Sequence, residues 1–283
     1  MKDRAAYTHM RFAWKNDRVV TTKSYHEGNA RISSRIPSHE RSPYYFLITM
    51  GGGYVEGEDY QIDVEVEENA SALITSQAPT YIFRSLNGEL TTQEIHLNLD
   101  HHSVLEFLMD DLLPYKDAKY TQKTVINMKE DATLLYLDGV TSGWSPDDKD
   151  FQYDALHLDT QVYMNDELVV SDYFISIPKN FKSMAQLGLF ENYKNYNSLI
   201  VINPDIDDHY IDSIRQQLDT VETNATYGIS KLEVPGFVLR ILGETMEDNK
   251  RYIFKCANQV RQDLLHYPSY QLRKNTYLDN ETF

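Results

Sequence analysis

The glycine run at residues 51–53, followed by Gly57, could in principle bring backbone amides close to a phosphate group. Nucleotide-binding fingerprints place such glycines after a strand and at the start of a helix, whose N-terminus faces the phosphate. Here the glycines precede an alternating strand pattern, and Glu56 and Glu58 would repel a phosphate. The run therefore predicts a turn between strands rather than a phosphate loop.

Three other polar groups also lack the spacing that chemistry requires. Ser142 lies directly before Gly143, which is not the Gly-x-Ser-x-Gly spacing of a serine hydrolase. His101 and His102 are neighbours, and neighbours on a strand point to opposite faces, so we expect a solvated turn rather than a metal site. An acidic cluster lacks the glycine and the terminal Glu of a calcium loop, and its members are Asp147, Asp148, Asp150 and Asp154. The failed search favours a binding or scaffold protein over an enzyme.

Composition narrows the possible partners. The 283 residues include 43 acidic and 27 basic side chains, a net charge of -16, and residues 1–50 hold nine of the basic side chains against four acidic ones. An acidic body repels phosphate backbones, so we expect no nucleic-acid partner. The single cysteine allows no intramolecular disulfide, and no apolar run approaches the roughly 18 residues of a membrane span. No apolar stretch follows Met1, so the prediction is a cytoplasmic protein without membrane contact.

Strands must position these residues, because period-two alternation dominates the middle of the chain. The clearest strands are residues 60–66 and 95–99, where apolar and polar side chains alternate. Hairpins are predicted at Asn165-Asp166 and Pro235-Gly236. Further strands are expected at residues 44–49, 71–75, 81–84, 104–108, 124–128, 133–137, 155–164, 168–174, 199–202, 225–232 and 237–242.

Two late segments have helical spacing instead, at residues 205–221 and 249–265. In the second, the pattern places Cys256 on the apolar face as a core thiol and turns Arg261 outward. The predicted organisation is a single domain with a β body at about 1–202, the first helix, strands at 225–242 and the second helix.

A weak internal repeat accompanies the strands. Residues 64–73 align with 126–135, both reading as strand, acidic turn and strand, and His101-His102 falls between them. The unit recurs roughly every 30 residues, a period typical of stacked coils or ribbons of sheet. Generic hairpin patterns would give a similar match, so both interpretations stay open.

Several blocks resemble the UreD (UreH) family of urease accessory proteins. The most specific are GGGYVEGED at 51–59 and ASALITSQAPTYIFRS at 70–85. Two later blocks are similar to the family, LEFLMDDLLPYKDA at 105–118 and GFVLRILG at 236–243. The resemblance implies a mainly β fold, a two-layer, β-helix-like stack of short strands with two helices near the C-terminus.

The resemblance also implies a function. UreD-like proteins are non-catalytic maturation factors that bind apo-urease together with the accessory proteins UreF and UreG, and the accessory complex dimerises. They help to deliver nickel to the urease active site, so Ni(II) passes in transit while GTP is bound by UreG rather than by this chain. No permanently bound cofactor is expected.

Carboxylates are weak oxygen ligands that suit a transient nickel relay. The residues that match family positions and are predicted to line this relay are Glu58, Asp59, Glu106 and Asp138. The residues of the specific block that are predicted to contact partners are Gln77, Arg84 and Ser85. The alternative function is a glycoside hydrolase with paired carboxylates, or a carbohydrate-binding protein, on the same β fold. An all-β adhesion module conflicts with the missing export signal.

Overall fold

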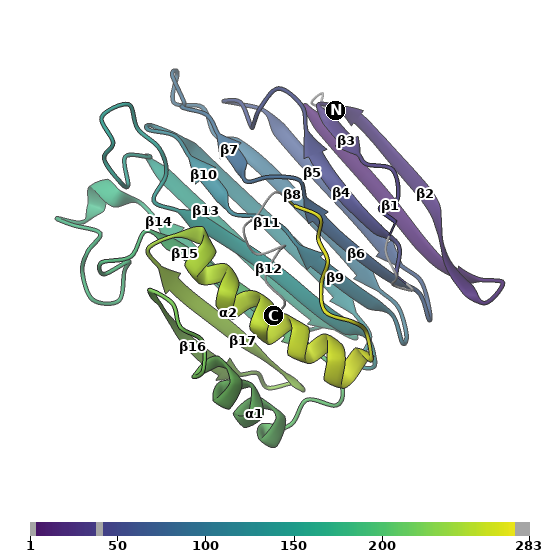
Figure 1. The fold of residues 1–283 in the computed structure, drawn as a ribbon. Coiled ribbons are helices and arrows are strands. Elements are labelled where there is room, and N and C mark those ends of the chain that lie inside the picture. Colours follow the sequence, from purple (N-terminus) through teal and green to yellow (C-terminus); the bar gives the residue numbers. More distant parts are fainter. Residues whose placement is uncertain (1–3, 38–41, 275–283) are drawn as a thin grey trace.

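The alternating segments form two β-sheets that pack face to face, as Figure 1 shows. The structure is a computed structural model that describes residues 4–37 and 42–274. The strands in chain order are β1 (Ala6–Lys15), β2 (Arg18–Gly28), β3 (Ala30–Ile32), β4 (Tyr44–Thr49), β5 (Asp59–Val66), β6 (Ser71–Ser76), β7 (Thr80–Ile82), β8 (Thr91–Leu99), β9 (Val104–Leu108), β10 (Leu112–Pro114), β11 (Lys119–Met128), β12 (Thr133–Thr141), β13 (Ala155–Met164), β14 (Glu167–Ser176), β15 (Asn195–Ile202), β16 (Ala225–Lys231) and β17 (Gly236–Gly243).

The first sheet has seven strands in the order β14-β13-β11-β8-β5-β1-β2, and its five inner strands run parallel. The second sheet has ten strands, of which eight follow the order β16-β17-β15-β12-β9-β6-β4-β3 while β7 and β10 pair beside them. Successive coils of the chain place one strand in each sheet, for example β8 and then β9. The expected two-layer, β-helix-like stack is therefore confirmed.

The weak repeat corresponds to these coils. Val64 pairs with Leu97 across β5 and β8, and Leu97 pairs with Ile126 across β8 and β11. The two segments aligned by sequence, 64–73 and 126–135, are thus equivalent parts of the first and third coils. The same register holds in every coil because each needs an apolar residue at this place in the core.

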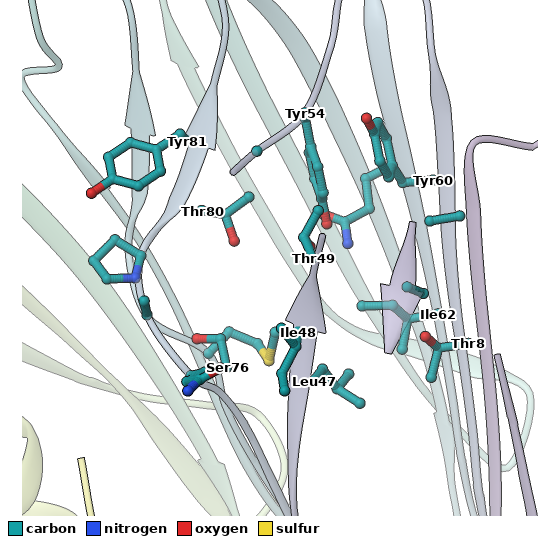
Figure 2. A pocket seen from close by; sticks show the side chains of 18 of the residues that line it. Thr8, Leu47, Ile48, Thr49, Tyr54, Tyr60, Ile62, Ser76, Thr80 and Tyr81 are labelled. Atoms are coloured by element: carbon teal, nitrogen blue, oxygen red, sulfur yellow. The ribbon is translucent and has the colours of Figure 1, made fainter. Parts of the chain in front are cut away.

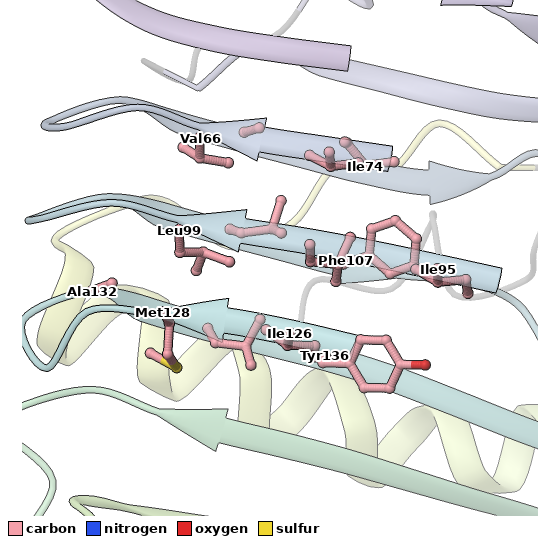
Figure 3. Close-up of a cluster of buried hydrophobic side chains, with 14 of the residues drawn as sticks. Val66, Ile74, Ile95, Leu99, Phe107, Ile126, Met128, Ala132 and Tyr136 are labelled. Carbon is pink, nitrogen blue, oxygen red and sulfur yellow. The ribbon is translucent and has the colours of Figure 1, made fainter. Parts of the chain in front are cut away.

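The space between the sheets is mostly apolar. Figure 3 shows the side chains of Val66, Leu99 and Met128 following one another on neighbouring strands of the first sheet. Facing them from the second sheet, the rings of Phe107 and Tyr136 stack with centroids 5.9 Å apart. Burial of these side chains at roughly 25 cal/mol per Å² is the main force that holds the two sheets together.

Helices cover the outer face of the second sheet (Figure 1). The first, α1, spans Asp208–Leu218 and the second, α2, spans Met246–Val260, so both lie within or overlap the predicted segments 205–221 and 249–265. A π-helical turn, Arg261–Leu265, follows α2. In the part of the chain that the structure describes, neither helix is long and apolar enough to cross a membrane.

Helix ends and helix faces follow the sequence closely. Asp207 caps α1 by accepting a hydrogen bond from a backbone amide, and Thr245 and Asp248 form a capping box at α2. Cys256 is fully buried between α2 and the second sheet, as predicted, and burial raises the pKa of its thiol well above the usual range. Helical periodicity thus places this cysteine correctly in the core.

Two expectations differ from the structure. Arg261, predicted to point outward, is fully buried and paired with Glu106, because α2 gives way to the wider π-helical turn at this residue. Strands β1, β2, β3 and β10 have no counterpart among the predicted strands. The reason is visible in β2, most of whose side chains are exposed, so its sequence lacks the alternation of a half-buried strand.

Candidate functional site

A row of polar side chains crosses the otherwise apolar space between the sheets. It begins on β8 and β11, where Gln93 and Gln122 are register partners on the faces that also bury Ile95 and Ile126. We use the name interior polar chain for six residues: Tyr54, Gln93, Tyr120, Gln122, Tyr136 and Asp138. Five of the six are buried and Asp138 is half-buried.

Hydrogen bonds connect the members of this chain. The Tyr120 hydroxyl lies 2.5 Å from Gln93 Oε1 and 3.0 Å from Gln122 Oε1. The Gln122 amide donates to Asp138 Oδ2 at 2.6 Å, and the Tyr136 hydroxyl donates to the same oxygen at 3.0 Å. A buried polar group without a partner costs free energy, and these contacts avoid that penalty. The arrangement therefore keeps a carboxylate at a fixed place inside the protein.

One end of the interior polar chain reaches a cavity of about 200 Å³, which we call the first opening. Figure 2 shows Tyr81 and Thr80 on one side of it, Tyr60 on the other and Tyr54 between them. The rings of Tyr54 and Tyr60 stack with centroids 3.7 Å apart, and Tyr54 and Gln93 both line the cavity. The first opening is thus directly connected to the chain.

A larger groove of about 580 Å³ lies between β14 and the pair β16 and β17. The ring of Phe174 stacks on Tyr196 at 4.9 Å in its wall. Asp172 and Arg240 also line the groove, and Arg240 Nη2 donates to Asp172 Oδ1 at 2.9 Å. We call this the second opening.

Asp138 lies between the two openings. Burial raises the pKa of its carboxyl group to about 7, although hydrogen bonds from Tyr136, the Gly139 amide and Gln122 lower it in part. Asp138 and Asp172 line one small cavity of about 20 Å³. This cavity has room for one water molecule and for nothing larger.

The four carboxylates predicted for a metal relay are not brought together. Asp138 belongs to the interior polar chain, and half-buried Glu58 accepts a hydrogen bond from Tyr60 beside the first opening. Asp59 instead lies on the face of β5 opposite to Tyr60, where it accepts a hydrogen bond from the Thr92 hydroxyl at 2.5 Å. Glu106 lies on the helix side of the second sheet. Within residues 4–37 and 42–274 no group of three His, Cys, Asp or Glu side chains has metal-binding geometry, and the relay stays a prediction.

The residues predicted to contact partners occupy different environments. Gln77 is exposed and lines the first opening, and Arg84 is exposed nearby in sequence. Ser85 joins its own loop to residues 117–119. Its hydroxyl accepts a hydrogen bond from the Lys119 amide at 3.2 Å, and its backbone amide donates to the Asp117 carbonyl oxygen. Gln77 is therefore the best placed of the three to contact a molecule at the first opening.

Sequence reasoning missed most of the interior polar chain. A signal was present for Gln93, because it shares the strand face of Ile95 and Leu97 and is thus a polar residue in a buried position. No such signal marks Asp172 and Arg240 in the sequence, because the two residues are 68 positions apart and lie on different strands. Only the packing of the two sheets brings them into contact.

Comparison with known proteins identifies relatives of this chain. The family model described as UreD urease accessory protein matches residues 4–276. A urease accessory protein UreD of Streptococcus salivarius (strain 57.I) is 42% identical over 269 residues, covering 95% of this chain and 96% of that protein. The corresponding protein of Bacillus cereus (strain ATCC 10987 / NRS 248) is 35% identical over 263 residues, covering 92% and 94%.

Proposed function

Since this chain belongs to the UreD family of urease accessory proteins, we propose that it is a scaffold which binds apo-urease together with UreF and UreG and passes Ni(II) along its interior. Its role lies in the maturation of urease, and it is an accessory protein rather than an enzyme. Nickel is cargo in this proposal, and GTP is bound by UreG.

The observation that supports an interior route is the interior polar chain itself. Buried amides, hydroxyls and a carboxylate cost more to desolvate than apolar side chains of similar volume, so they are a poor choice for stability alone. Here they form a continuous series from the first opening to Asp138. The series offers oxygen ligands at successive positions between two openings.

Oxygen ligands suit a relay better than a store. Nickel prefers nitrogen and thiolate ligands over carbonyl and carboxylate oxygens, so an isolated carboxylate such as Asp138 releases it readily to a site with better ligands. The only cysteine, Cys256, is buried on the other side of the second sheet and would not trap the ion. The cavity of about 20 Å³ beside Asp138 requires a partly dehydrated ion or a local widening of the sheets.

The pair Asp138 and Asp172 does not support the alternative of a glycoside hydrolase. Asp138 and Asp172 line the same cavity, as the two carboxylates of such an enzyme would, but its volume is about 20 Å³. Sites for sugar-sized ligands are typically roughly 300 Å³ or larger. A sugar ring therefore does not fit between these two carboxylates.

The test is coexpression of this chain with the urease subunits, UreF and UreG in a host without urease. Asp138→Asn removes the central charge with almost no change in shape. We expect it to lower nickel loading of urease by at least about tenfold, because loss of a group beside a metal usually lowers metal affinity or activity by that factor or more. The nickel content of purified urease and the copurification of each partner are measured together.

Asp159→Asn is the matched control. Asp159 lies on β13 of the first sheet, and its carboxylate accepts hydrogen bonds from the Gln161 amide on the face turned away from the interior polar chain. Asp159→Asn is expected to load nickel normally. Normal loading in Asp138→Asn would exclude the interior route and leave the scaffold role intact, whereas failure of the unmodified chain to copurify with urease or UreF would exclude the scaffold role.

A further inference from the structure

Arg240 places a guanidinium group in the wall of the second opening. In the second sheet Asp138, Ser198 and Arg240 are successive register partners on β12, β15 and β17. The row therefore leads in two steps from the central carboxylate to a side chain that is 44% exposed. A positive charge at the end of a row of oxygen ligands is unexpected for a cation path.

Asp172 is the junction between the interior and the second opening. It lines both the small cavity beside Asp138 and the groove. Its Oδ1 accepts from Arg240 at 2.9 Å and its Oδ2 accepts from the Ser198 hydroxyl at 2.8 Å. Both carboxylate oxygens are thus occupied, and the side chain is only 16% exposed.

A divalent cation and a guanidinium compete for such a carboxylate. The two positive groups repel each other at short range, and the repulsion is strong where water is scarce. A cation that moves between Asp138 and the groove must therefore displace Arg240 from Asp172 or stop behind it.

The surroundings of Arg240 allow this displacement. Its side chain is half-exposed and adjoins a groove of about 580 Å³, so the long flexible stem has room to turn outward. Glu191 lines the same groove, so a second carboxylate borders the space into which the guanidinium would turn. Tyr196 lines the same groove as Arg240.

We propose that Arg240 is the gate of the second opening, closing it by pairing with Asp172 and opening it by moving into the groove. The inference rests on the proposed function, because it concerns the same nickel route. An ordinary salt bridge that joins the edges of the two sheets is the competing explanation. The two differ in one respect: loss of either partner weakens a salt bridge equally, whereas a gate and its carboxylate ligand have opposite effects on nickel passage.

The experiment uses the full chain coexpressed with urease, UreF and UreG under limiting nickel, with a pulse of Ni(II) as the probe. The initial rate of nickel incorporation into urease is measured for Arg240→Gln, Arg240→Lys and Asp172→Asn. With Arg240→Gln, nickel incorporation into urease is expected to be roughly two- to fivefold faster. The effect is of this size because a partly exposed ion pair contributes only a small free energy. Asp172→Asn is expected to load more slowly by a similar factor, and Arg240→Lys at nearly the original rate because it keeps the charge.

Arg240→Met serves if Arg240→Gln accumulates poorly, because it keeps the apolar stem and removes the charge. The gate is excluded if neither variant loads faster than the unmodified chain, or if Arg240→Gln and Asp172→Asn both load more slowly. Asp138→Asn is run in parallel. Normal loading in Asp138→Asn shows that the route itself is wrong, whereas impaired loading there without acceleration in Arg240→Gln shows that only the gate is wrong.

Discussion

Arg261 and Glu106 form an ion pair in which neither side chain is exposed, although 155 positions separate them in the chain. Arg261 Nη1 lies 2.8 Å and 2.9 Å from the two oxygens of Glu106. The Tyr270 hydroxyl also donates to Glu106, and its ring lies 4.0 Å from Arg261 Cζ. This contact fastens the segment after α2 to strand β9 at the centre of the second sheet.

Replacement of one partner of this pair should destabilise the protein strongly. Glu106→Ala leaves the Arg261 charge buried without its carboxylate, and we expect the free energy of unfolding to fall by about 3–5 kcal/mol. The double variant Glu106→Leu with Arg261→Met should lose less than the single variant, since no charge is left buried. Urea denaturation measures both. Unchanged stability in Glu106→Ala would argue against a structural role for Glu106.

The glycine turn should tolerate substitutions unequally. Gly51 has a φ of +84° with open space around it, so Gly51→Ala should cost about 1–2 kcal/mol through the backbone alone. A Cβ at Gly53 would lie 2.4 Å from the Tyr81 carbonyl oxygen, which also accepts a hydrogen bond from the Tyr54 amide. Gly53→Ala should therefore be the more damaging change and should distort the first opening. Thermal unfolding of both variants checks the order, and equal midpoints would contradict it.

Stability should depend on pH through Asp111. This residue is buried, and burial raises the pKa of its carboxyl group from 3.8 to about 6, while Asn197, Lys250 and Lys274 lower it in part and Asp110 raises it. The folded state thus holds the proton more tightly than the unfolded state. Stability from this group is complete below about pH 4 and is lost as the pH rises to about 6. The stability difference between the unmodified chain and Asp111→Asn should fall over this window, by up to about 1.4 kcal/mol per pH unit, and a pH-independent difference would contradict the assignment.

Cys256 should not react with thiol reagents in the folded protein. It is fully buried and its pKa is raised by burial, so no thiolate is available at neutral pH. A thiol-specific dye should label no cysteine in native protein and one in denaturant. Cys256→Ser should lower the free energy of unfolding by about 1–3 kcal/mol, because it buries a hydroxyl among apolar side chains. Rapid labelling of native protein would show that α2 does not stay packed on the second sheet.

The individual strands, turns and helices of this fold were predictable because each leaves a pattern in a short stretch of sequence. Alternation located strand β5, turn residues located the hairpin at Asn165-Asp166, and helical spacing placed Cys256 in the core. Strand β2 escaped because its side chains are mostly exposed. The sequence alignment of 64–73 with 126–135 also matches the register of the coils, because Val64 and Ile126 both pair with Leu97 in the first sheet.

The sequence by itself thus determined the mainly β class, the two late helices and the blocks that carry the resemblance to UreD. Only the tertiary structure decided which carboxylates meet which partners. Asp138 joins Gln122 inside the protein, Glu106 is neutralised by Arg261 on the other side of the same sheet, and Asp172 meets Arg240 at the second opening. The physical reason is that strand patterns specify a face for each side chain, whereas contacts across the two layers depend on how whole sheets pack.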